Sequence, residues 1–175
     1  MAKLRKMLGS ADSPYIVSLM RLIETQSTVT LATWGMDYAK AHILPIYKKD
    51  YPNDNRLANA FNAAQDYLDG KIKLHIAKKI IKEVQVAAKE AEASPASQAA
   101  ARAVGAAAGI IYTPTHSLAV AFYGSAAIAY NEVGINESAD TYDQLAANEC
   151  AKMEAALCEI AAKDEKNPAK INWNC

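Results

Sequence analysis

Residues 94–112 read SPASQAAARAVGAAAGIIY, and this stretch decides the fold class. It contains eight alanines and two glycines. Alanine is the best helix former, so the stretch predicts a helix over residues 95–111. The two glycines in VGAAAG, residues 104–109, follow no predicted strand and therefore do not indicate a phosphate-binding turn. We interpret them as positions where this helix packs closely against another helix.

The composition of the whole chain agrees with this stretch. Alanine makes up about one in five of the 175 residues, while glycine, proline and phenylalanine are scarce. A chain of this length is long enough to bury a core within one domain. The sequence therefore predicts an all-α fold with closely packed helices.

Three Ser-Pro or Thr-Pro pairs mark the starts of helices, namely Ser13-Pro14, Ser94-Pro95 and Thr113-Pro114. A hydroxyl at the N-cap accepts a hydrogen bond from the first turn, and proline is tolerated at the next position. Pro45 should stop or kink the second helix. Hydrophobic spacing and these signals predict helices at 14–25, 28–44, 55–69, 71–93, 95–111, 114–131 and 139–163.

These segments predict a single-domain bundle of about seven helices over residues 14–164. Residues 1–13 form an N-terminal arm, and residues 165–175 form an irregular C-terminal tail. We find no internal repeat at a solenoid period and no linker long enough to divide the chain.

The charge, the cysteines and the N-terminus set expectations about partners and compartment. The formal net charge is zero, which does not favour nucleic-acid binding. Cys150 and Cys158 lie eight residues apart on a predicted helix, about 12 Å along its axis, which is too far for a disulfide. The N-terminal residues lack the apolar run of a secretory signal, and no charge-free apolar run is long enough to span a membrane. We expect a cytoplasmic protein that binds neither nucleic acid nor membrane.

The sequence lacks the common motifs of catalysis and of cofactor binding. It has no His-Glu-x-x-His, Cys-x-x-Cys, P-loop, Gly-x-Gly-x-x-Gly or Gly-x-Ser-x-Gly motif. No Glu stands three residues before His42, His75 or His116, so the paired ligands of a di-metal helical bundle are missing. The sequence predicts no metal, no cofactor and no catalytic residue, and thus a protein that is not an enzyme.

Five polar residues stand in apolar or helix-starting surroundings: Asp37, Asp54, Arg56, Arg102 and His116. A buried charge is costly without a partner, so we expect these groups to pair with one another or with helix termini. Asp54 suits an N-cap or first-turn position, where the helix dipole favours an anion. Two interpretations stay open, a polar pocket or a set of caps and buried pairs that fix the register of the helices.

His116 heads the apolar run HSLAVAFY, residues 116–123. If Thr113 caps the helix, His116 lies at the third helical position, where the dipole and burial both disfavour the charged imidazolium. We therefore expect a neutral ring that donates one hydrogen bond and accepts another. Such a histidine is more often a satisfied core residue than a ligand.

More than half of the chain, from about Thr30 to Tyr123, resembles the Imm-5-like family of immunity proteins. Four segments in order carry the resemblance, ATWGMDYAKAHILPIY, YPNDNRLANAFNAAQDYLDG, AARAVGAAAG and HSLAVAFY. Their matching positions are Trp34, Asp37, Leu44, Pro45, Pro52, Asp54, Arg56, Ala60, Ala64, Gly70, Arg102, Gly105, His116, Ala119 and Tyr123.

The resemblance implies a helical cytoplasmic protein that binds a cognate bacterial toxin domain and blocks it. Nine acidic residues lie between Glu132 and Glu165, where basic residues are few, and an acidic face would suit a basic nuclease toxin. The alternative is a small-ligand binder or an enzyme that uses a polar pocket of Asp37, Arg56, Arg102 and His116. This alternative requires those four side chains to converge on one open cavity.

Overall fold

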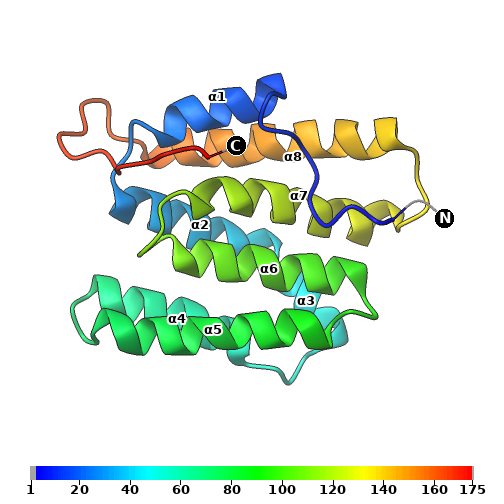
Figure 1. The fold of residues 1–175 in the computed structure, drawn as a ribbon, viewed down its shortest axis with the longest axis horizontal. Helices are drawn as coiled ribbons and strands as arrows, with labels where there is room; N and C mark the ends of the chain where they lie inside the picture. Colours follow the sequence, from blue (N-terminus) through cyan, green and yellow to red (C-terminus); the bar gives the residue numbers. More distant parts are fainter. Residues whose placement is uncertain (1–2, 175) are drawn as a thin grey trace.

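The computed structural model describes residues 3–174, which form eight α-helices and no strand (Figure 1). This confirms the all-α fold in a single helical domain, with one helix more than predicted. The helices are α1 (Pro14–Ile23), α2 (Thr28–His42), α3 (Leu44–Asp50), α4 (Arg56–Leu68), α5 (Leu74–Glu90), α6 (Pro95–Gly109), α7 (His116–Val133) and α8 (Ala139–Ile160).

The additional helix is α3, which begins just before Pro45. We predicted that this proline would end a helix. A helix does end there: the last residue of α2 is His42, and Ile43 is its C-cap. Ile43 is also the N-cap of α3, and Pro45 lies in the first turn of that helix. Proline is tolerated in a first turn because the N–H that it lacks has no helical partner there.

Helix α6 lies at the centre of the domain. It packs against α2, α3, α4, α5 and α7. Ten of its fifteen residues are buried. Figure 1 shows α1 and α8 on one side of the molecule and α4 and α5 on the other, with α2, α6 and α7 between them. The alanine-rich stretch predicted to pack closely is thus the helix that most of the others surround.

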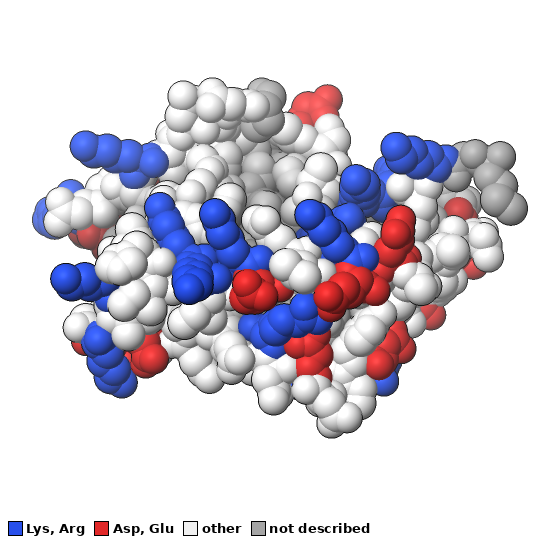
Figure 2. Space-filling model, turned by 60° about the horizontal axis from the view of Figure 1, so that its bottom comes forward, with Lys and Arg blue, Asp and Glu red and all other residues white. Residues whose placement is uncertain are grey.

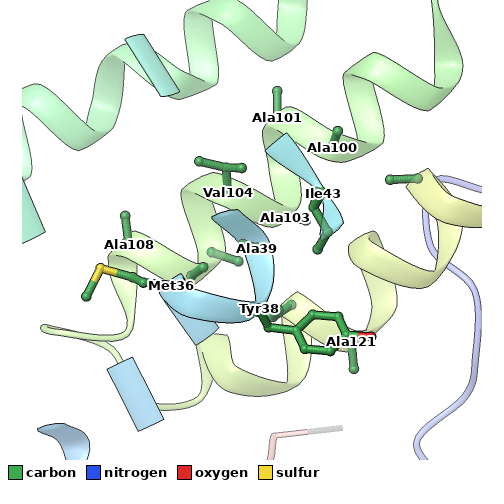
Figure 3. Packing of buried hydrophobic residues seen from close by; sticks show 14 of the residues in the cluster. Met36, Tyr38, Ala39, Ile43, Ala100, Ala101, Ala103, Val104, Ala108 and Ala121 are labelled. Atoms are coloured by element: carbon green, nitrogen blue, oxygen red, sulfur yellow. The ribbon is translucent and has the colours of Figure 1, made fainter. Parts of the chain in front are cut away.

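Helix α2 approaches α6 closely at Gly35. A Cβ atom added to Gly35 would lie 3.8 Å from the Cα of Ala107 and 2.6 Å from the Cδ1 of Ile110. Figure 3 shows Met36 and Ala39 of α2 among the small side chains of α6. The two backbones come this close because only small residues separate them.

The large aromatic residue of α2 joins that helix to α8. The side chain of Trp34 is buried, with a relative exposure of 2%. Its Nε1 donates a hydrogen bond of 2.9 Å to the backbone oxygen of Met153. Trp34 therefore supplies both apolar area and a buried polar contact between two elements that are distant in sequence.

The two Ser-Pro pairs mark helix starts as predicted, but the prediction that their serine hydroxyls cap the helices is wrong. Helices α1 and α6 do begin at Pro14 and Pro95, but neither preceding serine side chain accepts a hydrogen bond from the first turn. Ser94 Oγ instead donates to Asp50 Oδ2 at 2.6 Å, as does Ser97 Oγ. A carboxylate is a stronger acceptor than a neutral oxygen, and these two bonds lower the pKa of Asp50.

The predicted start of the helix over residues 114–131 is also corrected. Helix α7 begins at His116, two residues later than the prediction of 114, with Thr115 as N-cap. The backbone oxygen of Thr113 accepts from the N–H of His116 at 3.0 Å. Backbone carbonyls of this turn therefore replace the predicted hydroxyl cap. Side-chain caps occur instead at Ser27 and Ser138.

Both terminal segments pack on the helices. Leu8 is fully buried, and its N–H donates to the backbone oxygen of Phe122 at 3.2 Å. In the tail, the N–H of Ala169 donates to the backbone oxygen of Gln26 at 2.8 Å. These contacts fix the N-terminal segment on α7 and the C-terminal segment beside the α1–α2 connection.

The two described cysteines are unpaired, as their spacing predicted. Cys150 is buried and Cys158 is exposed. Burial raises the pKa of the Cys150 thiol to about 11, so this group is a protonated core residue at neutral pH. Cys175 lies outside the described residues.

Candidate functional site

Asp54 and Arg56 form one compact ion pair at the start of α4. Arg56 Nη2 lies 2.7 Å from Asp54 Oδ2, and Arg56 Nε lies 3.0 Å from Oδ1. The backbone N–H of Arg56 also donates to Asp54 Oδ1, so the carboxylate caps the first turn from the position before the N-cap Asn55. Asp54 thus lies one residue before the N-cap, not at the N-cap or in the first turn as expected.

Neighbouring helices complete this network. The hydroxyl of Tyr47 in α3 donates to Asp54 Oδ2 at 2.6 Å, and Arg56 Nη2 also contacts Glu90 Oε2 at the end of α5. The hydrogen bonds from Arg56, followed by that from Tyr47, hold the pKa of Asp54 well below its usual range. The network ties α3, α4 and α5 together, and its charged groups are occupied by one another.

We predict that Asp54→Asn lowers the free energy of unfolding by about 2 kcal/mol near pH 7, because it weakens charge-assisted hydrogen bonds. An unfolded aspartate has a pKa of about 3.9. Since the folded-state pKa is lower, the stabilisation is complete above about pH 4 and is lost as the pH falls below that value. Urea denaturation of both proteins across this pH range should show the difference closing in acid.

Glu137→Gln, at an exposed position, is the matched control and should show little change. Equal stability of Asp54→Asn and the original protein at pH 7 would show that the network is energetically neutral.

Asp37 is exposed on the surface of α2, which corrects the expectation that it is a buried charge needing a partner. Within residues 3–174 it forms no ion pair. It borders a hollow between α2 and α8 with Trp34, His42 and Glu159. The sequence of α2 reads as apolar on all sides because its exposed side also carries the apolar Val29, and this pattern hides the exposure of Asp37.

The buried carboxylate between α2 and α8 is Glu149. It is 6% exposed and accepts a hydrogen bond from the hydroxyl of Tyr38, while Lys152 Nζ lies 3.5 Å away. Burial and this contact raise the pKa of Tyr38 above its usual value. Sequence reasoning missed Glu149. The available signal was its position three residues after Ala146, because residues three apart lie on the same face of a helix and Ala146 is buried.

Arg102 and His116 line one cavity, between α5, α6 and α7, which we call the α5–α7 pocket. Its volume is about 300 Å³. No Asp or Glu among residues 3–174 lines it. Its apolar lining residues are small or aliphatic. Its polar and aromatic lining residues are Lys82, Gln85, Arg102, Tyr112, His116 and Tyr123.

His116 is the first residue of α7, not the third, and its ring packs over Gly109. A Cβ on Gly109 would lie 2.6 Å from His116 Nδ1, so glycine leaves the room that the ring occupies. Burial lowers the pKa of His116, in agreement with the expected neutral ring. The expectation of two hydrogen bonds is wrong, because the buried Nδ1 has no partner within residues 3–174.

The polar residues predicted from the sequence therefore fall into three places. Asp54 and Arg56 form a closed ion pair, Asp37 is exposed near α8, and Arg102 and His116 share the α5–α7 pocket. The four residues of the pocket alternative do not converge on one cavity.

A second candidate surface is the connection between α7 and α8. All residues from 131 to 140 are exposed, and we call this segment the acidic loop. It includes Glu132, Glu137 and Asp140 but no Lys or Arg. Val133 and Ile135 expose 38% and 45% of their areas there. Acidic charge and apolar area together are suited to contact with a basic protein surface.

The acidic loop has a defined conformation. The Tyr142 hydroxyl donates to the backbone oxygen of Gly134 at 2.8 Å and accepts from the N–H of Glu137 at 3.1 Å. The Tyr142 ring also packs edge to face against Tyr130, with centroids 5.4 Å apart. One buried tyrosine therefore holds the two sides of the loop together.

Much of the remaining acidic charge of α8 is engaged within the molecule. Asp143 pairs with Arg5 at 3.2 Å, and Glu154 accepts from Ser18 at 2.6 Å. The predicted acidic face is therefore partly occupied, and its remaining charge lies mainly in the acidic loop and from Glu159 onward. The opposite side of the molecule carries exposed lysines of α5, which Figure 2 shows in blue among scattered acidic residues.

The described residues contain neither a membrane-spanning helix nor a metal-binding cluster. No helix in the described part of the chain is long and apolar enough to cross a membrane. No group of three or more His, Cys, Asp or Glu side chains within residues 3–174 is placed to hold a metal ion. The fold and its surfaces define an all-α protein with an acidic loop on one side and a basic, aromatic pocket between helices.

Comparison with known protein families assigns this helical protein to one of them. Residues 21–156 match the family described as "Imm-5 like putative immunity protein". The match covers well over half of the chain, so the chain belongs to this Imm-5-like family. No curated protein and no solved structure matches it.

Proposed function

We propose that the protein is a bacterial cytoplasmic immunity protein, which binds a cognate toxin domain and neutralises it without catalysis. The observation that carries the proposal is the family match over residues 21–156. This range begins within α1 and ends within α8, so it includes the α5–α7 pocket and the acidic loop.

We propose the acidic loop as the surface that contacts the toxin. Its carboxylates would attract a basic nuclease-like domain, and this attraction speeds encounter in a salt-dependent way. Val133 and Ile135 would then supply apolar contact area at its tip. Because the Tyr142 hydroxyl bonds both sides of the loop, the surface is already ordered before a partner arrives.

Growth rescue tests neutralisation. The C-terminal domain of a toxin-like protein encoded beside this gene is expressed in bacteria with and without this chain. Rescue, together with a complex of the two purified proteins, would support the proposal. Continued toxicity with both proteins expressed and folded, and with no complex, would reject neutralisation of that toxin.

A charge-reversal pair then tests the contact surface. Glu132→Lys with Glu137→Lys should slow association at least tenfold at low salt and flatten its dependence on salt. Glu83→Lys with Glu92→Lys changes the net charge equally at exposed positions on α5 and in the turn that follows it, and should leave association near the original rate. If the acidic-loop variant associates at the original rate, the loop assignment is wrong even where rescue holds.

A further inference from the structure

We propose that the α5–α7 pocket binds a small organic anion that carries a planar ring. Such a site is separate from the acidic loop, whose charge would repel the same ligand. The proposal does not depend on toxin binding, since its test uses this protein alone.

The charge of the pocket selects an anion. Arg102 of α6 and Lys82 of α5 line it, and no carboxylate of residues 3–174 does. Arg102 also borders a second hollow that Glu92 lines, but the two side chains form no ion pair. A guanidinium offers five N–H donors in a plane and matches a carboxylate or a phosphate. Within residues 3–174 Arg102 forms no ion pair, so its charge and its N–H donors are available to a ligand in the cavity.

The aromatic walls select a ring. The guanidinium carbon of Arg102 lies 6.0 Å from the ring centre of Tyr123, and Lys78 Nζ lies 4.9 Å from that of Tyr112. Each tyrosine is therefore flanked by a cation, and both tyrosines line the pocket. A planar ligand can stack on an open tyrosine face while its acidic group reaches Arg102 or Lys82, the two cations that line the pocket.

His116, the small apolar lining residues and the volume of the pocket limit which ligands fit. His116 adds an imidazole whose buried Nδ1 has no hydrogen-bond partner within residues 3–174. Gly105, Ala106 and Ala119 also line the pocket, and residues this small leave room for a ring. At about 300 Å³ the cavity has the size of a small ligand site. It accommodates one ring system with an acidic group and is too small for a dinucleotide.

Isothermal titration at low ionic strength tests the proposal. The probes are 4-hydroxybenzoate and phenyl phosphate, which carry a ring and a charge. Benzamide lacks the charge, and acetate and inorganic phosphate lack the ring. At least one charged ring should bind at least tenfold more tightly than all three comparison probes. The better of the two acids identifies a carboxylate or a phosphate as the preferred group.

Variants locate the binding site. Arg102→Gln should weaken binding of the better probe at least tenfold, whereas Arg21→Gln, at an exposed ion pair on α1, should leave it unchanged. If Arg102→Gln does not fold, Lys82→Gln at the exposed rim decides and should weaken binding at least threefold. The proposal is overturned if neither charged ring binds, if the comparison probes bind equally well, or if the decisive folded variant binds normally.

Discussion

Trp34→Ala should lower the free energy of unfolding by about 3–5 kcal/mol, the usual cost of truncating a large buried aromatic residue. The side chain is 2% exposed between α2 and α8, and neither helix can close the space without moving the other. The change also removes the donor to the Met153 carbonyl. Urea denaturation followed by far-UV circular dichroism measures the loss.

Two companion variants separate the causes. Trp34→Phe keeps an aromatic ring but removes the Nε1 donor, and should cost about 1–2 kcal/mol. Trp173→Ala removes a tryptophan from the C-terminal tail, where Nε1 donates to Glu24 at 2.6 Å in partly exposed surroundings. It should cost about 1 kcal/mol. A loss at Trp34→Ala no larger than that at Trp173→Ala would contradict the role of Trp34 as a core link.

Ala107→Leu should destabilise the protein by about 3 kcal/mol, near the upper end of the usual cost of overpacking. Ala107 is fully buried on α6. Its Cα and Cβ both lie 3.8 Å from the position of a Cβ added to Gly35 of α2. A leucine side chain has no room at this contact, so the two helices must separate or the side chain must adopt a strained rotamer.

The same substitution at an exposed alanine serves as the control. Ala151→Leu lies on the exposed side of α8 and should change stability by no more than about 0.5 kcal/mol. Thermal or urea unfolding of the two variants compares added volume in the core with added volume on the surface. Similar unfolding midpoints for both would show that α2 and α6 tolerate greater separation than their contact suggests.

The helical fold was predictable because the local signals agree with the packing. Alanine-rich helices, with scarce glycine and proline, predicted an all-α domain. The start of α1 at Pro14 and of α8 at Ala139 matched the predicted residues. Pro45 was recognised as a stop but not as the first turn of α3, because the two roles have the same local sequence.

The candidate site was less predictable, because burial and partners depend on tertiary structure. The sequence marks Arg102 and His116 as unusual, but it does not predict their shared pocket, which exists only once α5 packs beside α6 and α7. Asp37 and Glu149 show that the sequence does not settle which face of a helix is buried. The aspartate among apolar neighbours points outward, whereas the glutamate in a charged helix is buried against Tyr38.

The alanine content of α6 has a consequence for the entropy of folding. Burying an alanine costs no rotamer entropy, whereas burying a leucine or a methionine costs about 0.5–2 kcal/mol each. Seven alanines of α6 are buried, so this helix meets its neighbours without immobilising flexible side chains there. Its stabilisation comes from the close fit of backbones. The centre of the domain should therefore be its most rigid part.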